Sequence, residues 1–224
     1  MGTDGFGRDV FARFNEGARI SLVVGILVAV AAALAGCVIG LIAGAIGRWT
    51  DGVLMRVMDV ILAFPPLMLA MAVTVGLGTG IRTATIGIML ACIPWYARLL
   101  RSEVLRLRSL PFVEAAAAIG TSRPRILIRH VVPHVIPTIL IQAASVFGFA
   151  VLTLAALGFV GLGAQIPTPE WGAMITEGLQ YTLTGQWWVG VFPGLGLLMA
   201  VTAATVLADR MRDLLDPRGE YRRA

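Results

Sequence analysis

The residues best suited to chemistry lie in one charged stretch, residues 111–133, between two long apolar runs. Its distinctive residues are Glu114, the alanines 115–118, Gly120, Arg123, Arg125, Arg129 and Pro133. Arginine side chains can pair with acids on another protein, which adds register and association rate more than affinity. Four consecutive alanines favour a slim helix that can enter a groove on a partner. This stretch, called the island below, therefore predicts docking to a partner rather than catalysis.

The island is expected to form two short helices with a sharp bend between them. Ser109 is placed to cap the first helix. Gly120 is expected to end it, because glycine enters the left-handed conformation without a Cβ clash. The second helix is expected to start at Thr121 or Ser122 and to end at Pro133, at the membrane. The alternative is a solvated amphipathic hairpin that binds nothing.

A metal site is not expected near the end of the island. His130 and His134 are four residues apart, a spacing that brings two imidazoles to one face of a helix. However, Pro133 and Pro137 interrupt that helix, and no third ligand lies nearby in the sequence.

Catalysis by this chain is not expected either. A phosphate-binding P-loop needs a lysine, and the sequence contains none. The few polar residues inside the apolar runs form no Ser/His/Asp or metal cluster. The two cysteines, Cys37 and Cys92, both lie in apolar runs, where we expect them to be small membrane-buried residues.

The elements that must hold the island are membrane spans. Of the 224 residues, 58% are hydrophobic and only 14% are charged. An apolar run of about 18 residues or more is long enough to cross the hydrocarbon core of a bilayer. Continuous runs indicate helices, because the strands of a membrane barrel would alternate. We expect an all-α polytopic membrane protein with about five spans, at residues 20–46, 53–75, 84–100, 135–157 and 187–207.

Arginine placement predicts the topology. All 18 basic residues are arginine, and fourteen of them follow the first, third and fifth spans or, as Arg56 and Arg98 do, lie near the adjoining span ends. Since positive loops stay in the cytoplasm, the island and the C-terminus are expected there, with the N-terminus and the loop of residues 158–186 outside. Despite the net charge of +5, no basic face is free of membrane, so nucleic-acid binding is not expected. The expected divisions are an extracytoplasmic amphipathic lead-in (1–19), a transmembrane domain (20–207) and a cytoplasmic tail (208–224).

The first expected span carries a packing face. Ala32, Gly36, Gly40 and Gly44 recur at intervals of four residues. Small residues at this spacing allow the backbone of another helix to approach closely. We expect helix packing there, and the stripe says nothing about a solute.

Asp59 is the acid that lies well inside an expected span, ahead of Pro65 and Pro66. An acid at membrane depth usually faces protein or a water-filled cavity. Two interpretations stay open, an interfacial acid paired with Arg56 one turn away, or a proton or substrate site. The two prolines remove backbone donors and are expected to bend the helix.

Six motifs, in order along almost the whole chain, resemble the peptide and nickel permease branch of type I ABC importers. They are Gly2-Thr3-Asp4-x-x-Gly7-Arg8-Asp9; Gly17-Ala18-Arg19-Ile20-Ser21-Leu22; Asp59 through Phe64-Pro65; Glu114-Ala115-Ala116 with Gly120 and Arg129-His130-x-x-Pro133; Phe159-x-Gly161-Leu162-Gly163 with Pro167-x-Pro169-x-Trp171-Gly172; and Asp209-x-x-Arg212-Asp213-x-Leu215-Asp216-Pro217-Arg218. One such motif would be a weak signal, whereas six in order are specific. The resemblance implies the transmembrane fold of type I importers and coupling helices in the cytoplasm.

By this resemblance the island is the EAA loop (residues 109–133), through which a permease contacts its ATPases. The implied coupling residues are Glu114, Ala115, Ala116, Gly120, Arg123, Arg125, Arg129 and Pro133. The general EAA pattern has Ile and Leu where this chain has His130 and Val132, so contacts at those two positions are expected to differ.

The resemblance also implies partners and a location. The chain would be a non-catalytic, multi-pass subunit of the bacterial inner membrane with a cytoplasmic C-terminus. Its partners besides lipid would be a second homologous permease, two cytoplasmic ATPases that bind ATP and Mg²⁺, and an extracytoplasmic solute-binding protein. No cofactor is expected in this chain. Docking of the binding protein is expected on the outer loop, at Gly161, Gly163, Pro167, Pro169 and Trp171.

Peptides are the expected solute, with nickel chelates and glutathione-type molecules as alternatives, because the binding protein of this class selects the solute. An ion-coupled secondary transporter is less favoured, since the sequence shows no internal repeat with paired midplane charges. A membrane scaffold without transport is the third interpretation. Members of the branch usually have another span before the Gly-Thr-Asp motif. We therefore expect five spans rather than six, through a downstream start or a truncation.

Overall fold

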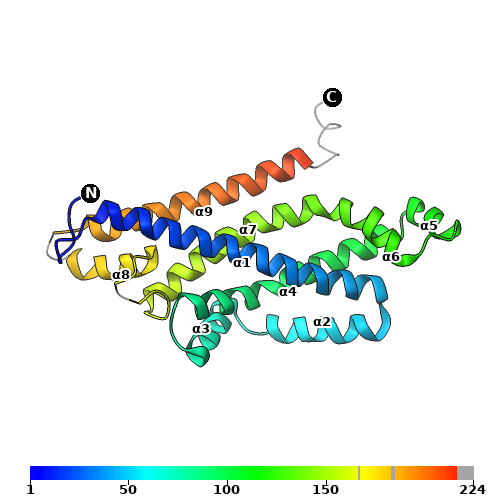
Figure 1. Ribbon diagram of the computed structural model, residues 1–224, viewed down its shortest axis with the longest axis horizontal. Coiled ribbons are helices and arrows are strands. Elements are labelled where there is room, and N and C mark those ends of the chain that lie inside the picture. Colours follow the sequence, from blue (N-terminus) through cyan, green and yellow to red (C-terminus); the bar gives the residue numbers. More distant parts are fainter. Residues whose placement is uncertain (166, 183–184, 216–224) are drawn as a thin grey trace.

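The computed structural model describes residues 1–165, 167–182 and 185–215, and Figure 1 shows that it is built from helices. These are α1 (Val10–Ile46), α2 (Arg48–Leu62), α3 (Pro66–Leu77), α4 (Ile81–Arg108), α5 (Pro111–Ala118), α6 (Arg123–Ile126), the π-helical turn η1 (Leu127–Val131), α7 (Val132–Phe159), α8 (Trp171–Thr182) and α9 (Trp188–Leu215). The short helices α5 and α6 lie at one end of the molecule, whereas the N-terminus and α8 lie at the other (Figure 1).

Four of these helices, α1, α4, α7 and α9, are long and apolar enough to cross a membrane. The pair α2 and α3 makes a fifth candidate, but the two helices meet at an angle of 87°. The expected all-α polytopic class is confirmed. The expected span at residues 53–75 is a broken span, because Pro65 and Pro66 remove backbone donors where α2 ends and α3 begins.

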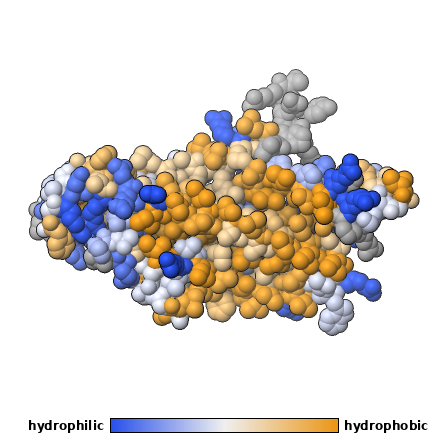
Figure 2. All heavy atoms as spheres, viewed as in Figure 1, coloured by the Kyte–Doolittle hydropathy of each residue, from blue (hydrophilic) through white to orange (hydrophobic). Residues whose placement is uncertain are grey.

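The surface suits a bilayer. Figure 2 shows apolar side chains over the middle of the visible face, with hydrophilic side chains gathered at the two ends. The long helix α1 begins at Asp9, whose carboxylate accepts a hydrogen bond of 2.9 Å from the amide of Phe11. Residues 10–19 of the expected lead-in are therefore the first turns of α1, and this helix runs unbroken into the apolar belt.

The small residues of α1 lie directly against α4. A Cβ atom added to Gly36 would lie 2.6 Å from the carbonyl oxygen of Ile93, and one added to Gly40 would collide with the carbonyl oxygen of Ala97. A Cβ atom added to Gly44 would lie 2.8 Å from the side chain of Val104. Both helices run from the α8 end toward the island, so the stripe packs two parallel helices backbone to backbone.

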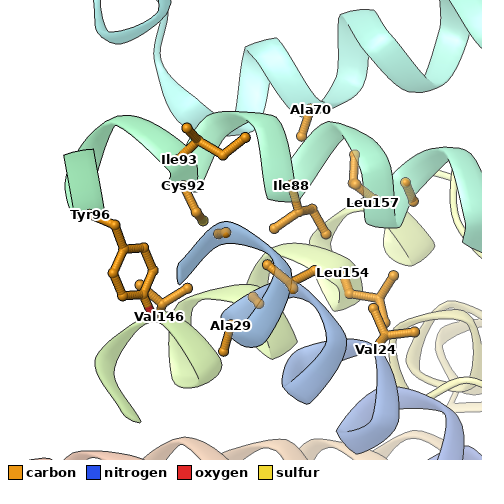
Figure 3. Packing of buried hydrophobic residues seen from close by; sticks show 14 of the residues in the cluster. Val24, Ala29, Ala70, Ile88, Cys92, Ile93, Tyr96, Val146, Leu154 and Leu157 are labelled. Carbon is orange, nitrogen blue, oxygen red and sulfur yellow. The ribbon is translucent and has the colours of Figure 1, made fainter. Parts of the chain in front are cut away.

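The main apolar core lies where α1, α4 and α7 meet, as Figure 3 shows. Val28 from α1, Ile88 from α4 and Leu154 from α7 are fully buried there. The helix α3 packs on the outside of α4, where a Cβ added to Gly87 would lie 2.7 Å from the carbonyl oxygen of Ala70. Three helices that are far apart in sequence therefore share one core.

Two ion pairs lie between α2 and α4. Arg101 donates to both oxygens of Asp51, at 2.5 and 2.7 Å. One to two turns nearer the α8 end of the molecule, Arg98 pairs with Asp59 at 2.5 Å. The expected pairing of Asp59 with Arg56 is therefore wrong, because the carboxylate turns toward the neighbouring helix rather than along its own.

Where α1 ends, Arg108 of α4 supplies donors to its last carbonyl groups. The guanidinium donates to the carbonyl oxygens of Gly44 at 2.7 Å and Ala45 at 3.1 Å. These carbonyls belong to the helix end, where an α-helix lacks internal donors. The last residue of α4 before the island is thus tied to the end of α1.

We predict that Gly40→Leu disrupts the packing of α1 against α4, because its new side chain meets backbone that cannot turn aside. The free energy of unfolding should fall by about 3 kcal/mol, the upper range for overpacking. Thermal melting of the purified protein in detergent measures this loss. The control is Gly52→Ala on α2, where nothing lies within 4 Å of the added Cβ. Equal melting of both variants would contradict the packing role of Gly40.

Candidate functional site

The first half of the island is a helix that ends in a glycine turn. The helix α5 stops at Ala118, and Gly120 follows with a φ of +82°. The amide of Thr121 then donates to the carbonyl oxygen of Ala116 at 3.1 Å, which closes the turn as a Schellman cap. Ser109 ends α4, and its hydroxyl donates to the carbonyl oxygen of Arg106. The expected bend at Gly120 is confirmed, whereas Ser109 belongs to the preceding helix.

The second half of the island continues into a membrane helix. The helix α6, the π-helical turn η1 and α7 follow one another without a break. The expectation that Pro133 ends the second helix is wrong, because Pro133 lies in the first turn of α7, where a missing amide is tolerated. The π-helical turn ahead of it changes the hydrogen-bond pattern locally, as such turns do in functional helices.

The island is anchored on one side and open on the other. Val113, Ile126 and Val131 are buried, and the ring of Phe112 stacks on His134 with centroids 5.5 Å apart. Other residues face outward, and these are Ala115, Ala118, Ile119, Gly120, Ser122, Arg125, Ile128 and Arg129. Ile119 is 83% exposed and Ile128 is 68% exposed, which is unusual for isoleucine at the end of a protein that must contact water. This open side is suited to contact with another protein.

The structure brings several predicted coupling residues together. Arg125, Arg129 and Pro133 line one open hollow with Ser122 and Ile128. Ala116 is half-buried behind the exposed Ala115 of the same helix. The side chains of Glu114, Arg123 and His130 lie outside the described part of the structure. In the part of the chain that is described, no three His, Cys, Asp or Glu residues are close enough to hold a metal ion.

At the opposite end, a network of charges fastens the N-terminal segment to α8. Asp4 is buried and accepts hydrogen bonds from the amides of Phe6 and Arg8, from Arg8 Nε at 2.6 Å and from Arg13 Nη1 at 2.7 Å. Arg13 also pairs with Glu177 of α8 at 2.8 Å. Burial alone would raise the pKa of Asp4, but the hydrogen bonds from Arg8, Arg13 and Phe6 outweigh it and hold that pKa below 3.8.

A second buried acid begins α8. Glu170 accepts hydrogen bonds from the amides of Gly172 at 2.9 Å and Ala173 at 3.0 Å, and from the Ser21 hydroxyl of α1 at 3.1 Å. Burial raises the pKa of Glu170, against the lowering effect of these three donors. Glu170 therefore caps α8 and ties it to α1.

The predicted outer-loop residues separate into two groups. Gly161 and Pro167 are exposed and Pro169 is half-buried, so this part of the loop is open to a partner. Gly163 and Trp171 are buried. The indole of Trp171 stacks on Phe14 and donates to its carbonyl oxygen at 3.2 Å, so Trp171 holds α8 against α1 and offers no surface for docking.

Several of these functional side chains were not singled out from the sequence. Asp4 stands inside the first motif and Glu170 stands between Pro169 and Trp171 of the outer-loop motif, so an acid within each motif was the available signal. Glu177 and Arg98 carry no such signal. The arginine partners of Glu177 are at least 164 residues away, and Asp59, the partner of Arg98, is 39 residues away. Only the tertiary structure brings those pairs together.

Comparisons with known proteins give a consistent result. The family described as "Binding-protein-dependent transport system inner membrane component" matches residues 36–220. The chain is 43% identical over 97% of its length to 71% of the dipeptide transport system permease protein DppC of Alkalihalophilus pseudofirmus. It is 39% identical over 97% of its length to 73% of the probable D,D-dipeptide transport system permease protein DdpC of Escherichia coli. It is 38% identical to the glutathione transport system permease protein GsiD of Pectobacterium atrosepticum, over 97% of this chain and 72% of that protein.

A solved structure shares the fold. An inward-facing form of the MetNI methionine ABC transporter contains a chain that superimposes with a TM-score of 0.72, covering 92% of this chain and 97% of that one. The sequence identity is 18%, so this likeness concerns the fold alone.

We predict that Asp4→Asn loosens the N-terminal segment from α8, because an amide cannot replace the carboxylate that two arginines share. The free energy of unfolding near pH 7 should fall by about 2 kcal/mol. Since the folded pKa of Asp4 is below 3.8, its contribution is present above that pH and is lost as the pH falls through the folded value. The difference in melting temperature between wild type and variant should therefore shrink below pH 4.

The matched control is Asp9→Asn, five residues along the chain. Asp9 caps α1 from an exposed position, and asparagine caps a helix about as well. A loss at Asp9 equal to that at Asp4, or a difference that does not change with acid, would contradict the role of the buried network.

Proposed function

This chain belongs to the family of binding-protein-dependent transport system inner membrane components, and we propose that it is the permease subunit of an ATP-driven importer of peptides. The membership follows from a family match over residues 36–220 and from relatives at about 40% identity over nearly the whole chain. As such it is a multi-pass membrane protein with the helical fold of ABC importer permeases. Peptide as the solute rests on the names of the dipeptide permeases among those relatives, with glutathione-type solutes as the neighbouring alternative.

The observation that carries the proposal is the position of the island. Its helix α5 stands at the end of the molecule opposite α8, connected directly to α4 on one side and through α6 and η1 to α7 on the other (Figure 1). Exposed arginines and isoleucines surround it, while Val131 of η1 packs in one apolar cluster with Val104 of α4 and Val135 of α7. A partner that grips this end therefore holds two membrane helices at once.

The proposed orientation places the island and the C-terminus in the cytoplasm. Apart from Arg98, which lies inside α4, thirteen of the other seventeen arginines then lie on the cytoplasmic side, as the positive-inside rule requires. The N-terminal segment, α8 and the exposed residues Gly161 and Pro167 face outward, where an extracytoplasmic solute-binding protein delivers the peptide. The C-terminal tail motif from Asp216 onward lies outside the described residues.

The proposed assembly contains a second homologous permease and two cytoplasmic ATPases of the bacterial inner membrane. The ATPases bind ATP and Mg²⁺, while this chain holds no cofactor and catalyses no reaction. Closure of the ATPases around ATP moves the two islands together, and the spans turn from inward-open to outward-open. Reversing a 1:99 population takes about 5.5 kcal/mol of differential interaction, which the two ATPase contacts must supply.

Reconstitution tests the proposal. The chain, expressed with its ATPases and second permease, should retain the ATPases through purification, and vanadate should trap the assembly. Proteoliposomes with ATP on the cytoplasmic side should take up radiolabelled dialanine only when the loaded binding protein is present. A purified chain that retains no ATPase and no vanadate-trapped complex would exclude the importer, whereas intact coupling without peptide uptake would exclude only the solute.

We predict that Gly120→Val uncouples ATP hydrolysis from uptake. A β-branched residue at a φ of +82° is strained by about 1–2 kcal/mol, so the cap that orients α5 opens. Uptake of dialanine should fall roughly tenfold while hydrolysis continues and membrane insertion is unchanged.

The control is Gly78→Val at the outer end of α3. Its φ of +97° also lies where a residue with a side chain is strained, and nothing lies within 4 Å of an added Cβ at either glycine. If both variants lost uptake equally, general strain and not the island would explain the result.

A further inference from the structure

Asp59 and Arg98 form an ion pair that stays open to the surroundings. Their side chains are 47% and 52% exposed, and Arg98 Nη2 lies 2.5 Å from Asp59 Oδ1. The neighbouring pair of Asp51 and Arg101 is less exposed, at 18% and 35%, and is bidentate. The two helices α2 and α4 thus carry one shielded pair that joins them and one open pair.

The open pair lies at membrane depth. Arg98 is 17 residues, about 26 Å, from the outer start of α4 and about 15 Å from its end. Beside it in α1 is Gly40, whose missing Cβ would contact the carbonyl oxygen of Ala97 and the amide of Arg101. At this level α1 has no charged residue between Arg19 and Arg48. Charged side chains at such a depth face water or protein rather than lipid.

A break in the helix lies next to the pair. Asp59 is in the last turn of α2, and the chain then bends by 87° into α3. Ala63, Phe64 and Pro65 at the bend are exposed. Non-helical backbone at membrane depth occurs only where protein buries it or where it borders a water-filled cavity. Two independent features therefore place water, a solute or another protein beside Asp59, and not lipid.

The local electrostatics select the chemistry of that solute. The C-terminal end of α2 carries a partial negative charge, and an acid in its last turn adds to it, so this position attracts a cation. The guanidinium of Arg98 offers a planar fork to a carboxylate. An exposed ion pair of this kind is weak. Each of the two side chains can therefore leave the other and bind the opposite charge of a ligand that carries both.

Resting on the proposed import of peptides, we infer that Asp59 and Arg98 bind the free ends of the peptide in the membrane, Asp59 its ammonium group and Arg98 its terminal carboxylate. The ligand class is a short zwitterionic peptide with both termini unblocked. After the binding protein has released its solute, the pair then selects a second time, because it favours solutes with two opposite charges over neutral ones.

The test uses the whole importer in proteoliposomes, with dialanine delivered by saturating binding protein. Asp59→Asn and Arg98→Gln should each lower the maximal uptake rate about tenfold, the effect of losing one charged hydrogen bond. The melting temperature and basal ATP hydrolysis should stay at wild-type values. The control Asp51→Asn should show the reverse, a lower melting temperature with nearly normal uptake per folded complex.

The double variant Asp59→Arg, Arg98→Asp separates ligand binding from a structural pair. If the single variants lose melting temperature in step with uptake, and the double variant recovers both, the pair is structural and the inference is overturned. Unchanged uptake in both single variants overturns it as well. If the wild-type importer retains its ATPases and is trapped by vanadate but takes up no peptide, the proposed solute is wrong, and this result is distinct from a failure of the ion-pair assignment.

A blocked peptide checks the ligand chemistry directly. Dialanine placed on the cytoplasmic side should slow uptake in wild type, because it occupies the pair, and should not slow the residual uptake of Asp59→Asn. N-acetyl-dialanine amide lacks both charges and should slow neither. Equal inhibition of wild type by the free and the blocked peptide would overturn the assignment.

Discussion

The contact on which the rest of the structure depends is the close approach of α1 and α4. Gly36, Gly40 and Gly44 remove the side chains that would otherwise separate the two backbones. In a bilayer, helices associate through such packing because lipid is as apolar as leucine and gives no hydrophobic driving force between spans. Once α1 and α4 lie together, α7 completes the core against both, and the shielded pair of Asp51 and Arg101 holds α2 beside α4. The broken span is therefore attached to a rigid frame.

The sequence predicted what local chemistry determines. The apolar runs predicted the long helices, the glycine stripe predicted a packing face, and Gly120 predicted the bend, because each depends on residues close together in the chain. It did not predict the partner of Asp59, since Arg98 is 39 residues away and a nearer arginine competed for that role. Proline rules also misplaced the end of the second island helix, because Pro133 is tolerated in the first turn of α7.

The two ends of the molecule handle charge in opposite ways. At the end with α8, Asp4 and Glu170 are buried and fully engaged, and they fix the N-terminal segment, α1 and α8 as one unit. At the island, Arg125 and Arg129 remain exposed. Burying a charge is costly unless hydrogen bonds compensate it, so the first arrangement stabilises a shape and the second leaves charges available to a partner. The sequence did not distinguish these roles, because burial depends on which elements meet.

The guanidinium of Arg108 has a mechanical consequence. Arg108 lies at the junction of α4 and the island, and its guanidinium donates hydrogen bonds to the terminal carbonyl groups of α1. A force on the island cannot move α4 along α1 without breaking the hydrogen bonds of Arg108. Such a movement would also bring side chains of α4 against the closely packed glycines of α1. The two helices consequently move together under load, so that a tilt applied at the island displaces the opposite end of α1, where Trp171 of α8 is hydrogen-bonded to it.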